Sequence, residues 1–317
     1  MRLWNLAVCI LLLGIFIIWL IYYIICHALE YRSPPRMIYE TDVLRYANAT
    51  FARRRIPRLI HQTYRTHDVP SIWNATVQSV IEKNFGEFKY RRWSHAEMDA
   101  FVKEHEPQFY RKTYITYSYD MQRIDSFRYV LLFYLGGIYI DMDNGCNRPF
   151  RDLIVTLESL EPNATHLAAF PRRDSFGVES DFLISTAGHP LYRQLISRLH
   201  LFNHYYILHF WTMLLSAGPI YVSIQERLFT SSEQSVVRLL DFTVFRPMFI
   251  RKENGFTWIG RDAHYLFYIS GKINGTKKNE KSFSNISILI KTSHEKSQLS
   301  NNVQRTRRKA KTKGKYK

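Results

Sequence analysis

The sequence contains only three cysteines among its 317 residues. Cys9 and Cys26 belong to a long apolar run near the N-terminus, which leaves Cys146 alone in the rest of the chain. A single thiol cannot form an intradomain disulfide, so the folded part must be stabilised by its core rather than by crosslinks. The length leaves room for one catalytic domain with appendages.

Acidic residues are also scarce, since 27 Asp and Glu stand against 44 Lys and Arg, a net charge of +17. Residues 272–317 hold fourteen Lys or Arg against Glu280 and Glu295, a net of +12, and +5 remains for all other residues. This basic segment is typical of a disordered, solvated tail, and contact with anionic lipid headgroups is the alternative. Because the excess charge lies mostly in this tail, the composition disfavours a nucleic-acid-binding protein.

Residues 6–26 contain no charged residue. About 20 apolar residues span a bilayer as a helix, so we expect a transmembrane anchor here. A cleaved signal peptide is the alternative, but its apolar core is usually shorter and ends at small residues. Five Asn-x-Ser/Thr sequons favour a lumenal location for the rest of the chain, at Asn48, Asn74, Asn163, Asn274 and Asn285.

The composition divides the chain into five parts. We expect a short cytosolic tail at 1–5, the anchor at 6–26, a stem at 27–55, a catalytic domain at 56–271 and the basic tail at 272–317. Pro34, Pro35 and three consecutive arginines interrupt any sustained apolar period in the stem.

Within the catalytic domain, the pattern alternates between strands and helices. We expect strands in the run that begins RIPRLIHQT and at 88–93, and a helix from the capping box of Ser94 and Glu97 to His105. From Asp120 the apolar spacing is helical, and Gly136-Gly137 ends that helix before a buried strand at 138–140. Residues 190–230 read as further helix, broken at Gly218-Pro219. This order predicts an α/β fold with a mostly parallel central sheet.

The stretch GGIYIDMDNGCN at 136–147 carries the main functional signal. Asp141 and Asp143 lie one residue apart at the end of the buried strand, so we expect both carboxylates to point into one cleft while Met142 faces away. Paired carboxylates at this position suit Mg²⁺ or Mn²⁺ that carries a diphosphate. A D-x-D pair alone is a weak motif, and a solvated acidic turn is the structural alternative. The position after GGIYI favours a glycosyltransferase that uses a nucleotide sugar, with Asp143 as metal ligand and Asp141 holding hydroxyls or metal-bound water.

Two charged residues lie on the helix that leads into this strand. Asp125 and Arg128 are three positions apart, so they share one helix face and could form a plain surface ion pair. The helix is otherwise apolar, and charged groups on its inner face need partners. We therefore favour recognition of the donor sugar by this pair.

Further candidates are less specific. Tyr64 could stack on the nucleotide base or simply pack, and His61 is more often a hydrogen-bonded core residue than a catalyst. His264, with Asp262 nearby, is a candidate metal ligand. Two aromatic clusters, at 110–119 and 205–211, fit either a lipid-linked acceptor or ordinary packing.

These residues resemble glycosyltransferase family 32, and within it the fungal inositol phosphoceramide mannosyltransferases. The resemblance covers roughly 56–271 and rests on four segments: IPRLIHQT at 56–63 followed by Tyr64 where Trp is usual, Asp125 with Arg128-Tyr129, GGIYIDMD at 136–143, and SAGP at 216–219. The second and third segments together are specific to the family.

The resemblance implies a GT-A fold, GDP-mannose as donor, Mn²⁺ (or Mg²⁺) as cofactor and retention of stereochemistry. It implies donor contacts from Asp125, Arg128, Tyr139 and Asp141, beside the candidate base contact of Tyr64, and metal binding by Asp143. The implied acceptor is inositol phosphoceramide. The implied setting is the membrane of the Golgi or endoplasmic reticulum, with a single-pass type II topology and a lumenal catalytic domain.

The chain departs from the family pattern at GFTWI (255–259), where Ile259 replaces an expected histidine. Reduced activity or a substitute ligand would follow. A C-terminal hydrophobic segment found in many relatives is replaced by the basic tail. Two alternatives remain open: α-1,6-mannosyl extension of protein N-glycans, and a non-catalytic subunit that partners an active paralogue in the membrane.

Overall fold

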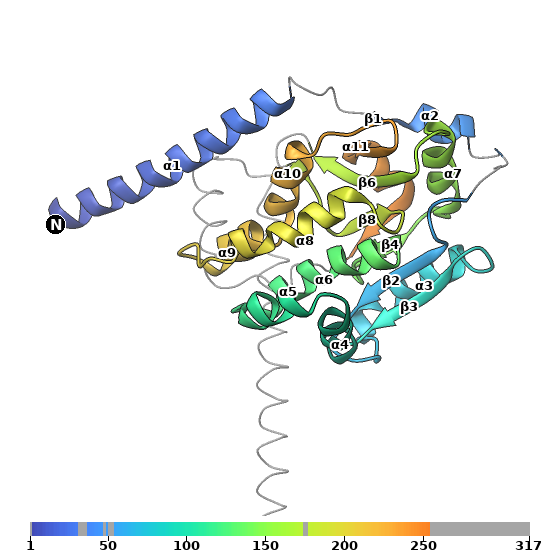
Figure 1. The fold of residues 1–317 in the computed structure, drawn as a ribbon, viewed down its shortest axis with the longest axis horizontal. Helices are drawn as coiled ribbons and strands as arrows, with labels where there is room; N and C mark the ends of the chain where they lie inside the picture. The colour runs from blue at the N-terminus through green and yellow to red at the C-terminus, as the bar shows by residue number, and fades with distance from the viewer. Residues whose placement is uncertain (1, 31–36, 47–48, 50–53, 174–176, 254–317) are drawn as a thin grey trace, which may run out of the picture. The chain divides into compact units, whose positions relative to one another are not determined.

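The computed structural model describes residues 2–30, 37–46, 49, 54–173 and 177–253, drawn in colour in Figure 1. In α1 (Arg2–Glu30), side chains are described only from Val8 to Tyr23. Within these described parts, no helix is found that is both long and apolar enough to cross a membrane. The membrane span predicted at 6–26 is therefore not confirmed. His264, the segment 255–259 and the basic tail lie outside the described residues.

The described strands form one eight-stranded sheet and a separate two-stranded one. The strand order of the main sheet is β1 (Met37–Ile38), β9 (Ser235–Asp241), β6 (His166–Arg173), β8 (Phe182–Ser185), β4 (Gly137–Ile140), β2 (Leu59–Thr63) and β3 (Lys89–Trp93), with β7 (Gly177–Val178) paired to β6. Strand β8 is antiparallel to β4 and β6, and β7 is antiparallel to β6, whereas the other pairings are parallel. The predicted α/β fold with a mostly parallel sheet is confirmed.

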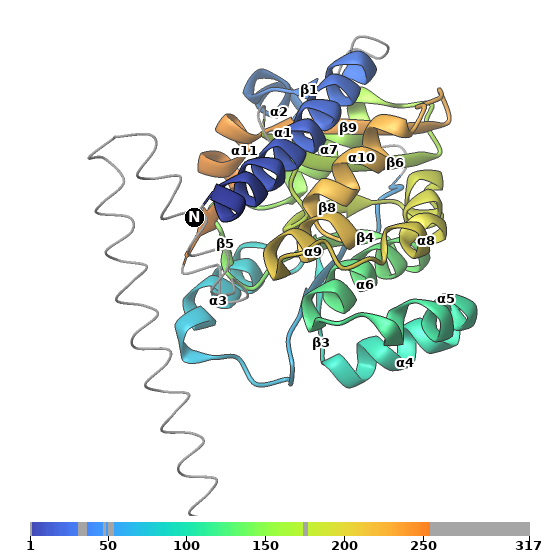
Figure 2. The ribbon, with the colours of Figure 1, turned by 90° about the vertical axis from the view of Figure 1, so that its left-hand side faces the viewer.

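Helices cover both faces of this sheet, as Figures 1 and 2 show. In β4, Ile138 and Ile140 pack into the core beneath α7 (Arg151–Leu160) and α11 (Phe242–Phe249), whereas Tyr139 packs into the opposite core. That opposite core includes side chains of α4 (His95–His105), α6 (Asp120–Tyr134) and α8 (Pro190–Phe202). A strand with apolar partners on both faces needs no polar alternation, which is why β4 is a continuous apolar run.

Shorter elements complete the described part of the chain. They are α2 (Glu40–Tyr46), η1 (Ser71–Trp73), α3 (Asn74–Lys83), α5 (Pro107–Lys112), η2 (Tyr114–Thr116), β5 (Asn144–Cys146), α9 (His209–Ser216), α10 (Pro219–Leu228) and β10 (Ile250–Lys252).

The local signals for helix boundaries are confirmed. At the start of α4, the Ser94 backbone N–H donates to the Glu97 carboxylate (2.8 Å) and the Glu97 N–H donates to Ser94 Oγ (3.3 Å), which is the predicted capping box. Helix α6 ends just before Gly136-Gly137, as its spacing predicts.

The two glycines after α6 fix the entry of β4. Gly136 and Gly137 have positive φ angles of 63° and 96°. A Cβ on Gly137 would lie 2.5 Å from the Leu59 carbonyl oxygen, because β4 begins tightly against β2. Only glycine fits both the backbone conformation and the space. The carboxylates that follow β4 therefore depend on this turn for their position.

Two boundaries differ from the sequence-based expectation. Strand β1 and helix α2 lie inside the predicted stem at 27–55, and β1 pairs in parallel with β9, so part of that stretch belongs to the sheet. A strand of two residues is too short to produce a periodic signal. The helical stretch 190–230 is broken at 218–219 as expected, and also between α8 and α9 at 203–208.

We predict that Gly137→Ala lowers the free energy of unfolding by about 3 kcal/mol or more, because positive φ costs an alanine about 1–2 kcal/mol and the carbonyl clash adds to this. Gly86→Ala is the matched control, since Gly86 also has positive φ (81°) but nothing lies within 4 Å of its added Cβ. Denaturant unfolding of both variants measures the difference. Equal losses would show that the contact with Leu59 is unimportant.

Candidate functional site

Asp141 and Asp143 lie in a turn rather than in a strand. Strand β4 ends at Ile140, and the Asn144 N–H donates to the Asp141 carbonyl (3.0 Å), which closes a four-residue turn. Alternation of side chains holds only in extended backbone, so the prediction that Met142 faces away from the acids is wrong. Asp141, Met142 and Asp143 all line the same cavity, of about 470 Å³.

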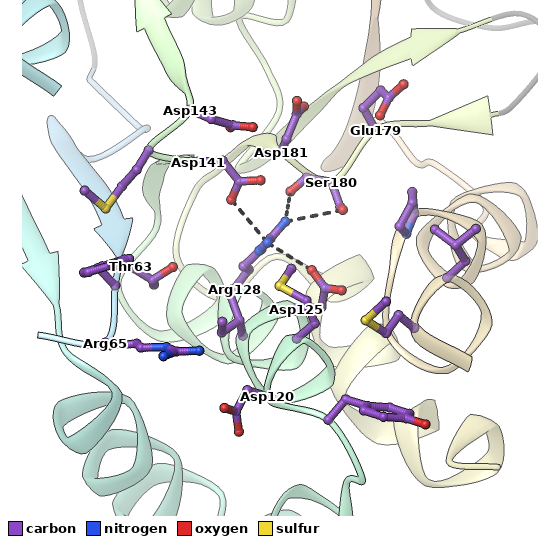
Figure 3. A pocket seen from close by; sticks show the side chains of 18 of the residues that line it. Thr63, Arg65, Asp120, Asp125, Arg128, Asp141, Asp143, Glu179, Ser180 and Asp181 are labelled. Carbon is purple, nitrogen blue, oxygen red and sulfur yellow. Dashed lines mark hydrogen bonds and ion pairs between the residues drawn. The ribbon is translucent and has the colours of Figure 1, made fainter. Parts of the chain in front are cut away.

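The cavity collects polar side chains from several elements (Figure 3). Among those that line it are Thr63 at the end of β2, Arg65, His95 of α4, Asp125 and Arg128 of α6, Glu179, Ser180 and Asp181 before β8, and Lys252 of β10. Its position outside the carboxyl ends of β2 and β4 is the usual ligand site of such sheets.

Arg128 is the central charged group of this cavity (Figure 3). Its Nη2 lies 3.0 Å from Asp125 Oδ1 and 3.2 Å from Asp141 Oδ1, and its Nη1 donates to the Ser180 carbonyl (2.6 Å). The Arg128 side chain is 2% exposed and that of Asp125 is 6% exposed. The predicted pair on α6 therefore exists, but it is buried and joins the helix to the turn after β4 and to the segment before β8.

Burial governs the protonation of these acids. It raises the pKa of Asp125 to about 7, although Arg128 opposes the rise. Burial and the neighbouring Asp141 raise the pKa of Asp143 to about 7, with Lys252 opposing. The acids after β4 are thus crowded carboxylates, and a further positive charge beside them would favour their ionised form.

Tyr139 supports Asp141 from behind. Its ring is fully buried and is not among the residues that line the cavity, so its predicted contact with a donor stays a prediction. The Tyr139 hydroxyl donates to Asp141 Oδ1 (2.9 Å) and lies 2.9 Å from Thr63 Oγ1. The Arg128 guanidinium carbon lies over the Tyr139 ring, at 4.7 Å from the ring centroid. Tyr139 therefore orients one carboxylate and one guanidinium of the cavity.

Two side chains in and just after β2, His61 and Tyr64, differ in their surroundings. Tyr64 lines the cavity wall, and its ring packs edge-on against Trp73 with 5.7 Å between the ring centroids. His61 is a core residue, as expected: its Nε2 lies 3.0 Å from the Gly136 carbonyl, and Trp93 Nε1–H donates to its Nδ1. Burial lowers the pKa of His61 to about 4, so it is neutral at physiological pH.

Sequence reasoning missed three charged residues beside Asp143. Asp181 Oδ2 accepts from Arg246 Nη2 and lies 3.2 Å from Lys252 Nζ, and Lys252 Nζ lies 3.7 Å from Asp143 Oδ2. Burial alone would raise the pKa of Asp181, but Lys252 and Arg246 outweigh it and lower that pKa to about 2. None of these residues belongs to a recognisable motif, and Lys252 follows Asp143 by more than a hundred positions. No signal in the sequence marked them.

Few protein ligands for a divalent ion lie near the turn. Among the described residues, no group of three or more His, Cys, Asp or Glu is arranged to hold a metal ion. However, Asp143 Oδ1 and Asp181 Oδ1 are buried and have no hydrogen-bond partner in this part of the chain. Mg²⁺ and Mn²⁺ typically take one or two protein carboxylates and complete their shells with phosphate and water. The carboxylates present fit that pattern, whereas His264 lies outside the described residues.

The aromatic clusters serve two purposes. Tyr114 and Tyr117, of the cluster at 110–119, are buried in the core, so these two side chains serve packing. Tyr119 lines the cavity and stacks edge-on against His209 at 4.1 Å between centroids. Tyr205, by contrast, is 65% exposed.

Comparison with known proteins identifies the region around the turn. Residues 70–163 match the family described as glycosyltransferase sugar-binding region containing DXD motif. The chain is 30% identical over 230 residues to mannosyl phosphorylinositol ceramide synthase CSH1 of Saccharomyces cerevisiae, a match that covers 69% of this chain and 58% of that protein. It is 29% identical over 234 residues to inositol phosphoceramide mannosyltransferase 1 of Schizosaccharomyces pombe, which covers 72% and 70%.

Among solved structures, the chain is weakly similar to PaToxG glycosyltransferase, with a TM-score of 0.39 and 16% identity over 65% of this chain and 78% of that one.

We predict that Arg128→Met lowers the free energy of unfolding by about 3–5 kcal/mol, because it leaves the buried Asp125 carboxylate without its cation. Adding Asp125→Asn should recover part of that loss, since the double variant no longer buries that uncompensated charge. Denaturant unfolding of the two single variants and the double variant completes the cycle. Strictly additive losses would show that the two side chains are not energetically coupled.

Proposed function

Because the chain belongs to the glycosyltransferases whose sugar-binding region contains a DXD motif, here Asp141-Met142-Asp143, we propose that it is a metal-dependent mannosyltransferase. Its donor would be GDP-mannose and its acceptor inositol phosphoceramide, in the synthesis of mannosylated sphingolipid. The names of the two fungal relatives support this choice of sugar and acceptor. The chain covers only 58% of the first of them, so its own activity remains a proposal.

The observation that carries the proposal is the meeting of the DXD turn with the buried Arg128 and Asp125 in one cavity. The Arg128 guanidinium and the Asp125 carboxylate supply a donor and an acceptor for sugar hydroxyls at a fixed distance from Asp141. Tyr64 at the cavity wall offers an aromatic face for the nucleotide base. We also propose that the fold has the GT-A arrangement.

The reaction proposed breaks the bond between mannose C1 and the diphosphate oxygen and forms a bond from C1 to an acceptor hydroxyl oxygen, whose proton passes to the departing GDP. Asp143, with Asp141 beside it, would hold a Mn²⁺ or Mg²⁺ ion. Such an ion, when bound, offsets the negative charge that develops on the departing diphosphate. Tyr139 and Arg128 hold Asp141 in place, so this carboxylate needs little reorganisation during the reaction. We propose that the anomeric configuration is retained.

An exposed apolar surface near the cavity supports a lipid acceptor. The loop 203–208 presents Tyr205 and Ile207, which are 65% and 66% exposed, and Ile207 has a positive φ of 65°, which is uncommon for a β-branched residue. Asn203 Nδ2 donates to Thr116 Oγ1 (2.9 Å), so Ile115, 50% exposed, lies beside this loop. The loop and η2 lead directly to His209 and Tyr119 at the cavity wall.

We propose the Golgi as the location of the reaction.

We predict that Asp143→Ala lowers mannosyl transfer by about 10²–10³-fold, the usual loss when one group that stabilises leaving-group charge is removed. The measurement is transfer of labelled mannose from GDP-mannose to inositol phosphoceramide, with and without Mn²⁺. Glu104→Ala, an exposed acid on α4, serves as the control. Wild-type rates for Asp143→Ala would remove this residue from the site, and label in glycoprotein rather than lipid would overturn the acceptor.

We also predict that Tyr205→Ser combined with Ile207→Asn raises the KM for the lipid acceptor about tenfold, because burial of these apolar side chains against lipid is lost. Asparagine tolerates positive φ better than isoleucine does, so the fold should not suffer. The KM for GDP-mannose should stay constant. Phe85→Ser, which removes an 87% exposed aromatic between α3 and β3, is the control. Equal effects in the two proteins would exclude a specific role for the loop.

A further inference from the structure

Strand β10 brings a lysine against the DXD turn. In the antiparallel pair of β10 and β5, Lys252 lies opposite Asn144, the residue that follows Asp143. The Glu253 N–H also donates to the Asp143 carbonyl (2.9 Å). These backbone contacts therefore fix the position of the Lys252 Cα beside the turn, although Lys252 is distant from Asp143 in the sequence.

The Lys252 ammonium group lies between two buried carboxylates. Its Nζ is 3.2 Å from Asp181 Oδ2 and 3.7 Å from Asp143 Oδ2. Asp181 has a second cationic partner in Arg246, whereas the ion pair that Asp143 makes within the described residues is the one with Lys252. The remaining oxygen of each carboxylate is buried and has no hydrogen-bond partner in the described residues. One positive charge thus faces two acids that still have unused acceptor capacity.

We propose that Lys252 is a built-in competitor of the divalent ion, one that neutralises Asp143 while the ion is absent and sets how tightly the ion binds. The proposal rests on the proposed function in one respect, namely that Asp143 is a ligand of the ion. The ammonium group and the ion are drawn by the same carboxylate, so the ion must displace the lysine to use both of its oxygens. The family pattern does not explain Lys252, because the matched region ends at residue 163.

The surroundings of Lys252 allow such a displacement. Its side chain is 35% exposed and lines the cavity, so the ammonium group lies beside accessible space rather than inside the core. Asp181 keeps Arg246 when the lysine moves, so no buried carboxylate is stranded. Lysine also suits exchange better than arginine, because its flexible stem carries a point charge with no fixed bidentate geometry.

The test is binding of Mn²⁺ alone to the purified full chain, with free Mn²⁺ followed by electron paramagnetic resonance. We expect Lys252→Met to bind Mn²⁺ about tenfold more tightly than the wild type, a difference of about 1.4 kcal/mol. Lys252→Arg, which keeps the charge, should bind no more tightly than the wild type.

The neighbouring residue provides a matched control. Arg251→Met removes the same charge from the same strand, but Arg251 pairs with Glu253 (2.6 Å), and adjacent strand residues point to opposite faces. Its Mn²⁺ affinity should match that of the wild type. An equal gain in Arg251→Met would attribute the effect to overall charge and overturn the proposal.

Unchanged or weaker Mn²⁺ binding by Lys252→Met, with a melting temperature near that of the wild type, would also overturn it. If Lys252→Met does not fold, Lys252→Gln takes its place with the same expectation. Absence of Mn²⁺ binding in every variant would overturn it as well. If the proposed function alone is wrong, mannosyl transfer would be absent while the difference in Mn²⁺ affinity between wild type and Lys252→Met remained.

Discussion

The buried guanidinium of Arg128 is the interaction on which the cavity depends. A charge at 2% exposure must be compensated locally, and Arg128 meets Asp125, Asp141 and the carbonyl of Ser180. These partners come from a helix, from the turn after β4 and from the segment before β8. The three chain segments therefore share one arrangement, and the position of the DXD turn follows from charge neutralisation as much as from the path of β4.

A second set of charges lies on the other side of the turn. Asp181 is held by Arg246 and Lys252, and Lys252 reaches Asp143. Together, Asp125, Asp141, Asp143 and Asp181 face three cations, Arg128, Arg246 and Lys252, so these seven groups carry one net negative charge when all four carboxylates are ionised. That residual charge, with the unpartnered oxygens of Asp143 and Asp181, suits a site that takes up a cation together with an anionic donor.

Sequence reasoning succeeded where local chemistry decides the outcome. The capping box at Ser94, the end of α6 before Gly136-Gly137, and the burial of residues 138–140 on both faces all follow from neighbouring residues. Prediction failed where an element was too short to show a pattern or where its backbone was not extended as assumed. The two residues of β1 leave no period to detect, and the extended backbone assumed for Asp141 and Asp143 is in fact a closed turn.

By itself, the sequence determined the α/β class, the buried strand before the acids, and the pairing of Asp125 with Arg128, because each rests on residues within a few positions of one another. Only the tertiary structure decided that Tyr139 lies behind Asp141, that Asp181 joins the site and that Lys252 returns on β10 to meet Asp143. Those contacts join residues that are distant in the chain or stacked across the sheet. Their formation depends on strand order and register, which no local pattern of side chains encodes.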